Sequence, residues 1–119
     1  MGGFRKNRVS ELMRQVISDL IRDKIKDPRI IGVTITEVKM ADDLKSAIVY
    51  FASLADGKHE LHLEGLQAAE GFLRRQLRGE LDLKYIPVLS FHYDTSFDNY
   101  DRISRLLKKV EPPGTEDDE

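Results

Sequence analysis

The spacing of apolar residues changes along this chain between two periods, and the order of these changes constrains the fold more than any other feature. Apolar side chains at positions i, i+3, i+4 and i+7 predict an amphipathic helix, whereas alternation predicts a strand with one buried face. Helical spacing covers residues 8–26, 59–77 and 100–110, and alternation covers residues 30–40, 45–54 and 88–94. The predicted order is helix, strand, strand, helix, strand and a short C-terminal helix. We therefore expect an α+β domain with the helices on one face of a three-stranded sheet and the other face open.

Turn and breaker residues set the limits of these elements. Pro28 disfavours helical geometry at Asp27, so the first helix is expected to end there. Residues 41–44 and 55–58 are predicted turns, and the first of them joins the first two strands as a hairpin. A change of phase at Thr36–Glu37 predicts a β-bulge in the first strand.

The second long helical segment contains glycine at positions 65 and 71. A glycine inside a helix costs up to about 1 kcal/mol relative to alanine. We therefore expect Gly71 to mark a kink or a close approach of the backbone to another element. The segment would then be a kinked helix followed by a second helical piece before the third strand.

Composition narrows the class of protein further. The 119 residues include no cysteine, which excludes thiol nucleophiles, cysteine-based zinc sites and iron–sulfur clusters. No apolar run approaches the roughly 20 residues of a membrane-spanning helix, and the basic N-terminus lacks the apolar stretch of an export signal. We expect a cytoplasmic protein with one domain, residues 1–110. Residues 111–119 carry five acids and no base, and they are predicted to form a disordered acidic tail.

Charge is unevenly distributed along the chain. The net charge is −2, but residues 1–110 hold all 19 basic side chains and 16 of the 21 acidic ones, a net of +3. The basic residues gather in three clusters. These are Arg5, Lys6 and Arg8, then Arg74, Arg75 and Arg78, then Arg102, Arg105, Lys108 and Lys109. Such clustering favours a polyanionic partner.

The usual enzyme motifs are absent. The chain has no glycine-rich phosphate loop, no G-x-S-x-G elbow and no dinucleotide-binding fingerprint. His59 and His62 could meet on one helix face as a weak metal site, but a solvated first helical turn explains the pair better. His92 is expected on the surface of a strand, and Asp42–Asp43 are expected in a turn. We predict a protein without catalytic residues, metal or cofactor.

The cluster Arg74, Arg75 and Arg78 has two interpretations. A solvated helix face explains most charged runs. Alternatively, the three guanidinium groups follow a kink at Gly71, where freed backbone N–H groups would help them to bind phosphate. The residues themselves leave both interpretations open.

Five stretches, in this order, resemble one known family over residues 4–107. They are Arg8–Val9, Ile25–Arg29, Asp43–Phe51, Ala69–Arg74 and Pro87–Ser96. Together they resemble ribosome-binding factor A, a family of bacterial factors for assembly of the small ribosomal subunit.

The resemblance implies a type II KH-like domain of order α-β-β-α(kinked)-α-β. KH domains usually hold nucleic acid with a GxxG loop between two helices. This sequence has no GxxG, and the family replaces it with the kink motif Ala69, Glu70 and Gly71. That departure favours docking on folded ribosomal RNA over ordinary single-strand binding.

The resemblance also implies a function. Members are non-catalytic and act late in maturation of the 30S ribosomal subunit, near the ends of 16S rRNA, and a ribosome-associated GTPase helps to release them. We accordingly expect a monomer that binds the 30S subunit and 16S rRNA and assists rRNA processing. Eight basic side chains are the predicted RNA contacts: Arg5, Lys6, Arg8, Lys45, Arg74, Arg75, Arg78 and Lys84.

Two other functions fit the same residues. One is a generic KH-like module that binds single-stranded RNA or DNA. The other is an adaptor that binds only protein, through the apolar sheet. Sedimentation with purified 30S subunits, compared with binding of short oligonucleotides, separates the three.

Overall fold

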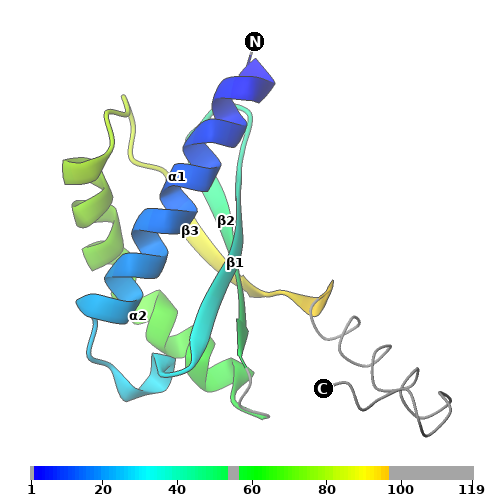
Figure 1. Cartoon of the computed structure of the whole chain (residues 1–119), viewed down its shortest axis with the longest axis vertical. Helices are drawn as coiled ribbons and strands as arrows, with labels where there is room; N and C mark the ends of the chain where they lie inside the picture. The colour runs from blue at the N-terminus through cyan, green and yellow to red at the C-terminus, as the bar shows by residue number, and fades with distance from the viewer. Residues whose placement is uncertain (1, 54–56, 97–119) are drawn as a thin grey trace, which may run out of the picture.

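The computed structural model of the chain describes residues 2–53 and 57–96, with side chains from Lys6 onward. It contains two α-helices, a short 3-10 helix and three strands (Figure 1). In chain order they are α1 (Gly2–Asp23), η1 (Pro28–Ile30), β1 (Val33–Met40), β2 (Ser46–Ser53), α2 (His59–Glu80) and β3 (Val88–Tyr93). The predicted helix at 100–110 and the predicted tail at 111–119 lie outside the described residues.

The three strands form one mixed sheet in the order β1-β2-β3. β1 and β2 pair antiparallel as the predicted hairpin, and their register shifts between Ile35 and Glu37, which confirms the predicted bulge. β2 and β3 are parallel, so the chain must cross the sheet between them, and α2 makes this crossover. The α+β prediction with three strands is confirmed.

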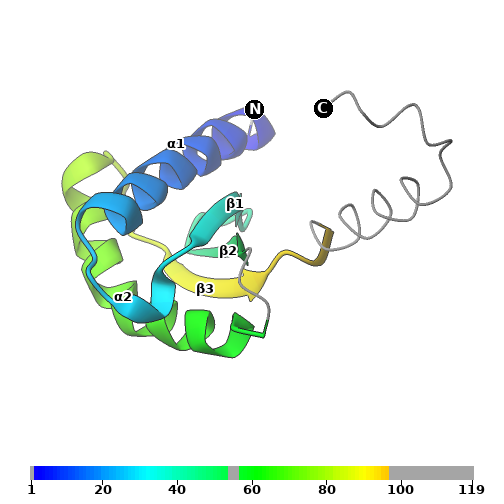
Figure 2. The same ribbon diagram turned by 60° about the horizontal axis from the view of Figure 1, so that its bottom comes forward.

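Both long helices pack on the same face of the sheet (Figure 2). The core between them consists of side chains with almost no exposed surface. They include Met13 and Ile17 from α1, Val49 and Phe51 from β2, and Leu66, Leu73 and Leu77 from α2. On the other face of the sheet Lys39, Ser90 and His92 are exposed, and no described helix covers them. His92 is a surface strand residue, as predicted.

The first helix differs from its predicted limits at both ends. It begins at Gly2 rather than residue 8, and it ends at Asp23 rather than residue 26. Pro28 therefore does not end α1 directly, and it instead begins η1. The Asp27 carboxylate caps η1 by accepting a hydrogen bond from the backbone N–H of Arg29 at 2.9 Å. The Arg29 guanidinium also donates to this carboxylate, and these bonds hold the pKa of Asp27 below its usual range.

α2 is one helix from His59 to Glu80, not the two helical pieces predicted. Its ribbon changes direction about midway (Figures 1 and 2), so the helix bends without a break in its assignment. The prediction of a close approach at Gly71 is wrong. Gly71 is exposed, its φ angle is not positive, and a Cβ there would meet only Nη1 of Arg75, at 3.6 Å. The close approach is at Gly65 instead, where a Cβ would lie 2.7 Å from Cγ2 of Ile30.

Gly71→Ala is expected to stabilise the domain by up to about 1 kcal/mol, because alanine loses less backbone entropy in a helix and the methyl group has room. Denaturant unfolding of the full chain measures the change. Gly79→Ala is the matched control, since this glycine also lies in open space but in the last turn of α2, where we expect a smaller gain. A less stable Gly71→Ala protein would show that the bend in α2 requires glycine.

Candidate nucleic-acid interface

Two loops meet at one end of the sheet. Met40 at the end of β1 pairs with Ala47, and Ser46 at the start of β2 pairs with Val88 at the start of β3. The 41–45 turn and the 81–87 connection therefore lie at the same end, which we call the loop end. In Figure 1 it is at the top, together with the N-terminus. Of the eight predicted RNA-binding residues, Lys45 and Lys84 lie in these two loops. Lys6 on α1 and Arg74 on α2 form bonds with the loops, and the remaining four also belong to these two helices.

Lys6 joins α1 to the loop end. Its ammonium group lies 2.7 Å from Oδ1 of Asp42 in the turn, and this bond lowers the pKa of the Asp42 carboxyl. The neighbouring Asp43 accepts a hydrogen bond from the backbone N–H of Lys45 at 3.0 Å. Both aspartates lie in the 41–45 turn, and Asp43 has the predicted role of a backbone acceptor, whereas Asp42 pairs with Lys6 of α1. Arg8, two residues after Lys6 in α1, is exposed, whereas the side chain of Arg5 lies outside the described residues.

Lys45 and Lys84 both lie near the ring of Tyr85. The ammonium group of Lys45 lies 5.3 Å from the ring centroid of Tyr85, and that of Lys84 lies 5.5 Å from it. Both lysines are exposed, and 49% of the surface of Tyr85 is accessible to solvent. The sequence-based prediction missed Tyr85. The signal was a tyrosine next to a lysine in a segment with neither helical nor alternating spacing.

Arg74 has a structural role. Its guanidinium donates to the backbone carbonyl oxygens of Ile86, at 3.0 Å, and Pro87, at 3.1 Å. Glu70, one turn earlier on α2, accepts a hydrogen bond from the backbone N–H of Leu89 at 3.1 Å and lies 3.8 Å from Arg74. These bonds fasten the C-terminal half of α2 to the start of β3. Two of the five N–H donors of Arg74 are therefore bonded to the protein itself.

Arg75 and Arg78 are exposed on the C-terminal half of α2. Arg75 folds back along the helix, so that its Nη1 lies beside Gly71. Neither side chain makes bonds like those of Arg74 to Ile86 and Pro87. Of the arginine cluster, Arg75 and Arg78 remain available for an external anion.

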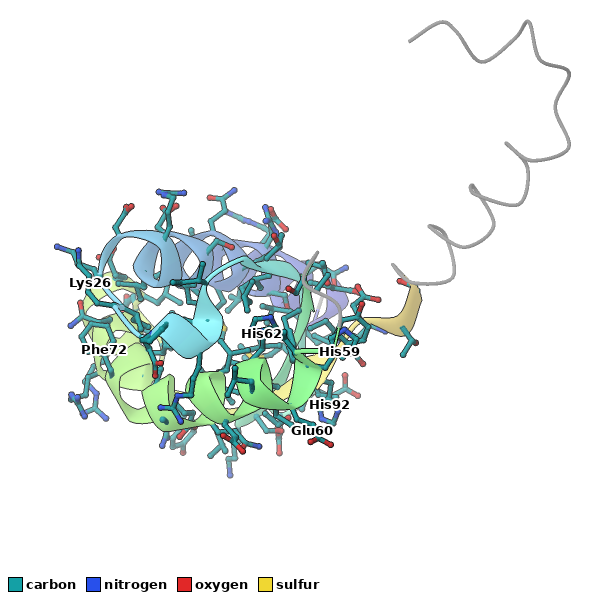
Figure 3. All side chains as sticks on the ribbon, turned by 90° about the horizontal axis from the view of Figure 1, so that it is seen from below. Lys26, His59, Glu60, His62, Phe72 and His92 are labelled. Atoms are coloured by element: carbon teal, nitrogen blue, oxygen red, sulfur yellow. The ribbon has the colours of Figure 1, made fainter. Side chains whose placement is uncertain are left out.

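The three residues of the kink motif face in three directions. Ala69 lines a recess of about 280 Å³ that is shared with Lys24, Lys26 and Phe72, and Figure 3 shows Lys26 and Phe72 at the same edge of the molecule. Glu70 faces β3, and Gly71 faces solvent. Ala69 faces this recess, whereas the guanidinium group of Arg74 faces the 81–87 connection, so the two side chains do not share one surface.

The histidine pair differs from both sequence-based interpretations. His62 is only 2% exposed, and its ring nitrogens lie 2.6 Å from the carbonyl oxygen of Arg29 and 2.9 Å from Oγ of Ser53. The prediction of a solvated pair is wrong for His62. His59 stacks on Tyr93 with the ring centroids 3.6 Å apart. Figure 3 shows His62 directed into the protein. Within residues 2–53 and 57–96, no group of three or more acidic or histidine side chains could hold a metal ion.

Comparison with known proteins identifies the family. The family model of ribosome-binding factor A matches residues 5–107 of the chain. This chain belongs to the ribosome-binding factor A family. The ribosome-binding factor A of Syntrophobacter fumaroxidans is 44% identical over 110 residues, which cover 89% of this chain and 93% of that protein. The Geobacter sulfurreducens protein is 40% identical over 115 residues, with coverage of 96% and 98%.

Solved structures of ribosome-binding factor A share the fold. The crystal structure of the Thermus thermophilus protein superposes with a TM-score of 0.68 at 23% identity, covering 74% of this chain and 93% of that one. A homology model of the Thermus thermophilus factor, fitted into a cryo-EM map of a 30S complex, gives a TM-score of 0.63 at 21% identity, with coverage of 76% and 97%. Among the described residues, no helix is long and apolar enough to cross a membrane.

Proposed function

We propose that this protein binds the free 30S ribosomal subunit through 16S rRNA and assists late maturation of the subunit and rRNA processing, without catalysing a reaction. Membership of the ribosome-binding factor A family, over residues 5–107, carries the proposal. The fold supports it, because the Thermus thermophilus factor with the same fold was fitted into the map of a 30S complex.

The exposed basic side chains are the proposed contacts to rRNA phosphates. Lys45 and Lys84 lie at the loop end, and Arg75 and Arg78 lie on the half of α2 that leads into it. The exposed Arg8 extends the set from the start of α1. Arg5, whose side chain lies outside the described residues, and Lys6, which is half-buried and pairs with Asp42, are also proposed as contacts because they belong to the same basic cluster in the sequence. Each phosphate contact releases counterions from the RNA, so binding through these residues should weaken steeply as salt concentration rises. Arg74 is left out of this set, because its guanidinium holds the start of β3.

Cosedimentation tests the function. The full chain is expected to sediment with purified 30S subunits and not with 70S ribosomes. Binding to short single-stranded oligonucleotides with no preference for the subunit would instead identify a generic KH-like module. Absence of binding to both would identify a protein adaptor.

Charge reversal at Arg75 and Arg78 tests the RNA surface. The double variant Arg75→Glu/Arg78→Glu is expected to lose sedimentation with 30S subunits, because two attractive contacts to phosphate become repulsive. Single alanine substitutions should each reduce the slope of log K against log salt by about 0.7 to 0.9. Because both side chains are exposed, the circular dichroism spectrum and thermal melting should not change.

The matched control is Arg22→Glu. Arg22 is an exposed arginine near the C-terminal end of α1, where it pairs with Asp19 and Asp23. This variant makes the same Arg→Glu change once, on a different surface, and it should bind 30S subunits like the unmodified protein. Unchanged binding by the Arg75→Glu/Arg78→Glu variant would remove α2 from the proposed interface.

A further inference from the structure

Two ammonium groups lie near one exposed aromatic ring at the loop end. The ring of Tyr85 is half accessible, with Nζ of Lys45 and Nζ of Lys84 each less than 6 Å from its centroid. The two lysines come from different loops, one following the 41–44 turn and the other in the 81–87 connection. The fold therefore assembles this cluster from residues about forty positions apart in the sequence.

Hydrogen bonds hold the backbone that follows Tyr85 in the chain. Arg74 binds the carbonyl oxygens of Ile86 and Pro87, directly after the tyrosine. The N–H of Val88 donates to the carbonyl oxygen of Lys45 at 3.0 Å, which ties the connection to the turn. An exposed ring on a fixed backbone loses little conformational freedom when a ligand packs on it, and this lowers the cost of binding.

The chemistry of the cluster fits an unpaired nucleotide. A base stacks on an aromatic face, and the phosphates on either side of it attract cations. Stacking of a base on an aromatic side chain is stronger than a cation–π contact at an exposed site, so a base would displace an ammonium group from the ring. The displaced lysine has a flexible stem, and its charge can then reach a neighbouring phosphate.

We propose that Tyr85 is a stacking platform for one unpaired rRNA base, and that Lys45 and Lys84 bind the phosphates that flank this base. This inference rests on the proposed function, because it assigns a contact within the same RNA interface. The two flanking positive charges favour RNA over an apolar protein surface as the occupant. The neighbouring Val88 is 54% exposed, so the test must also detect an apolar protein contact.

The experiment measures affinity of the full chain for purified 30S subunits over a range of KCl concentrations, for the unmodified protein and for Tyr85→Phe, Tyr85→Leu and Tyr85→Ala. Tyr85→Phe keeps the aromatic face and should bind like the unmodified protein. Tyr85→Leu and Tyr85→Ala should bind about 5- to 100-fold more weakly at every salt concentration, with an unchanged salt slope, because stacking is not ionic. Lys45→Ala and Lys84→Ala should instead reduce the salt slope, by about 0.7 each.

Each result decides between the alternatives. If Tyr85→Ala binds like the unmodified protein, the platform is overturned and the proposed function stands. If Tyr85→Leu restores binding relative to Tyr85→Ala, the ring packs on an apolar protein surface and the RNA assignment is overturned. If the unmodified protein does not bind 30S subunits, both proposals are overturned. Thermal melting of each variant confirms that the half-exposed side chain is not needed for folding.

Discussion

Gly65→Ala is expected to destabilise the domain by about 1–3 kcal/mol, the cost of adding a methyl group to a well-packed site. The new Cβ would lie 2.7 Å from Cγ2 of Ile30 and 2.9 Å from Cβ of Arg29. Neither neighbour can move aside easily. Ile30 is buried in the core, and Arg29 is held by its bonds to Asp27 and by the contact of its carbonyl oxygen with His62.

Denaturant unfolding of Gly65→Ala beside Gly71→Ala provides the measurement. The two substitutions make the same chemical change in the same helix, and we expect effects of opposite sign because only Gly65 touches another element. The difference between the variants therefore isolates the contact of α2 with η1 from helix propensity. Equal stabilisation by both would show that η1 can move away from α2 at little cost.

The elements with a local sequence signal were predicted correctly. Amphipathic spacing located both long helices, and alternation located all three strands, because burial of one face imposes these periods on neighbouring residues. The bulge in β1 was also visible, since an extra residue shifts the alternation at Thr36–Glu37. The start of α1 could not be located, because residues 2–7 contain only one large apolar side chain to mark a helix face.

The functions of individual side chains were harder to predict when their partners lie far away in the sequence. Gly65 is small because Ile30, thirty-five residues earlier, packs against it. Arg74 was predicted as an RNA contact from its cluster with Arg75 and Arg78. Its bonds to the backbone carbonyl oxygens of Ile86 and Pro87 leave no sequence signal, because any residue at those positions supplies a carbonyl group. The cluster at Tyr85 could not be predicted, because Lys45 comes beside the ring only through the pairing of β2 with β3.

His62→Ala is expected to destabilise the domain by about 2–4 kcal/mol. Nδ1 of His62 donates to the carbonyl oxygen of Arg29, at 2.6 Å, and Nε2 lies 2.9 Å from the hydroxyl oxygen of Ser53. The ring thereby ties the first turns of α2 to η1 and to the end of β2. Alanine would leave the carbonyl oxygen of Arg29 without this donor and would open a cavity where the buried ring lies, and the two costs add.

Two variants separate these costs in the same denaturant unfolding experiment. Ser53→Ala removes the hydroxyl group that faces Nε2 but leaves the ring and its bond to Arg29 in place, so it should cost less than His62→Ala, about 1 kcal/mol. His59→Ala removes a histidine from the same turn of α2 that stacks on Tyr93 but is partly exposed, and it should cost less than His62→Ala. If His62→Ala and His59→Ala destabilise the domain equally, the buried ring does not tie η1 to α2. A loss confined to His62→Ala would instead show that the packing of α2 against η1 and β2 depends on this side chain, which contacts both Arg29 and Ser53.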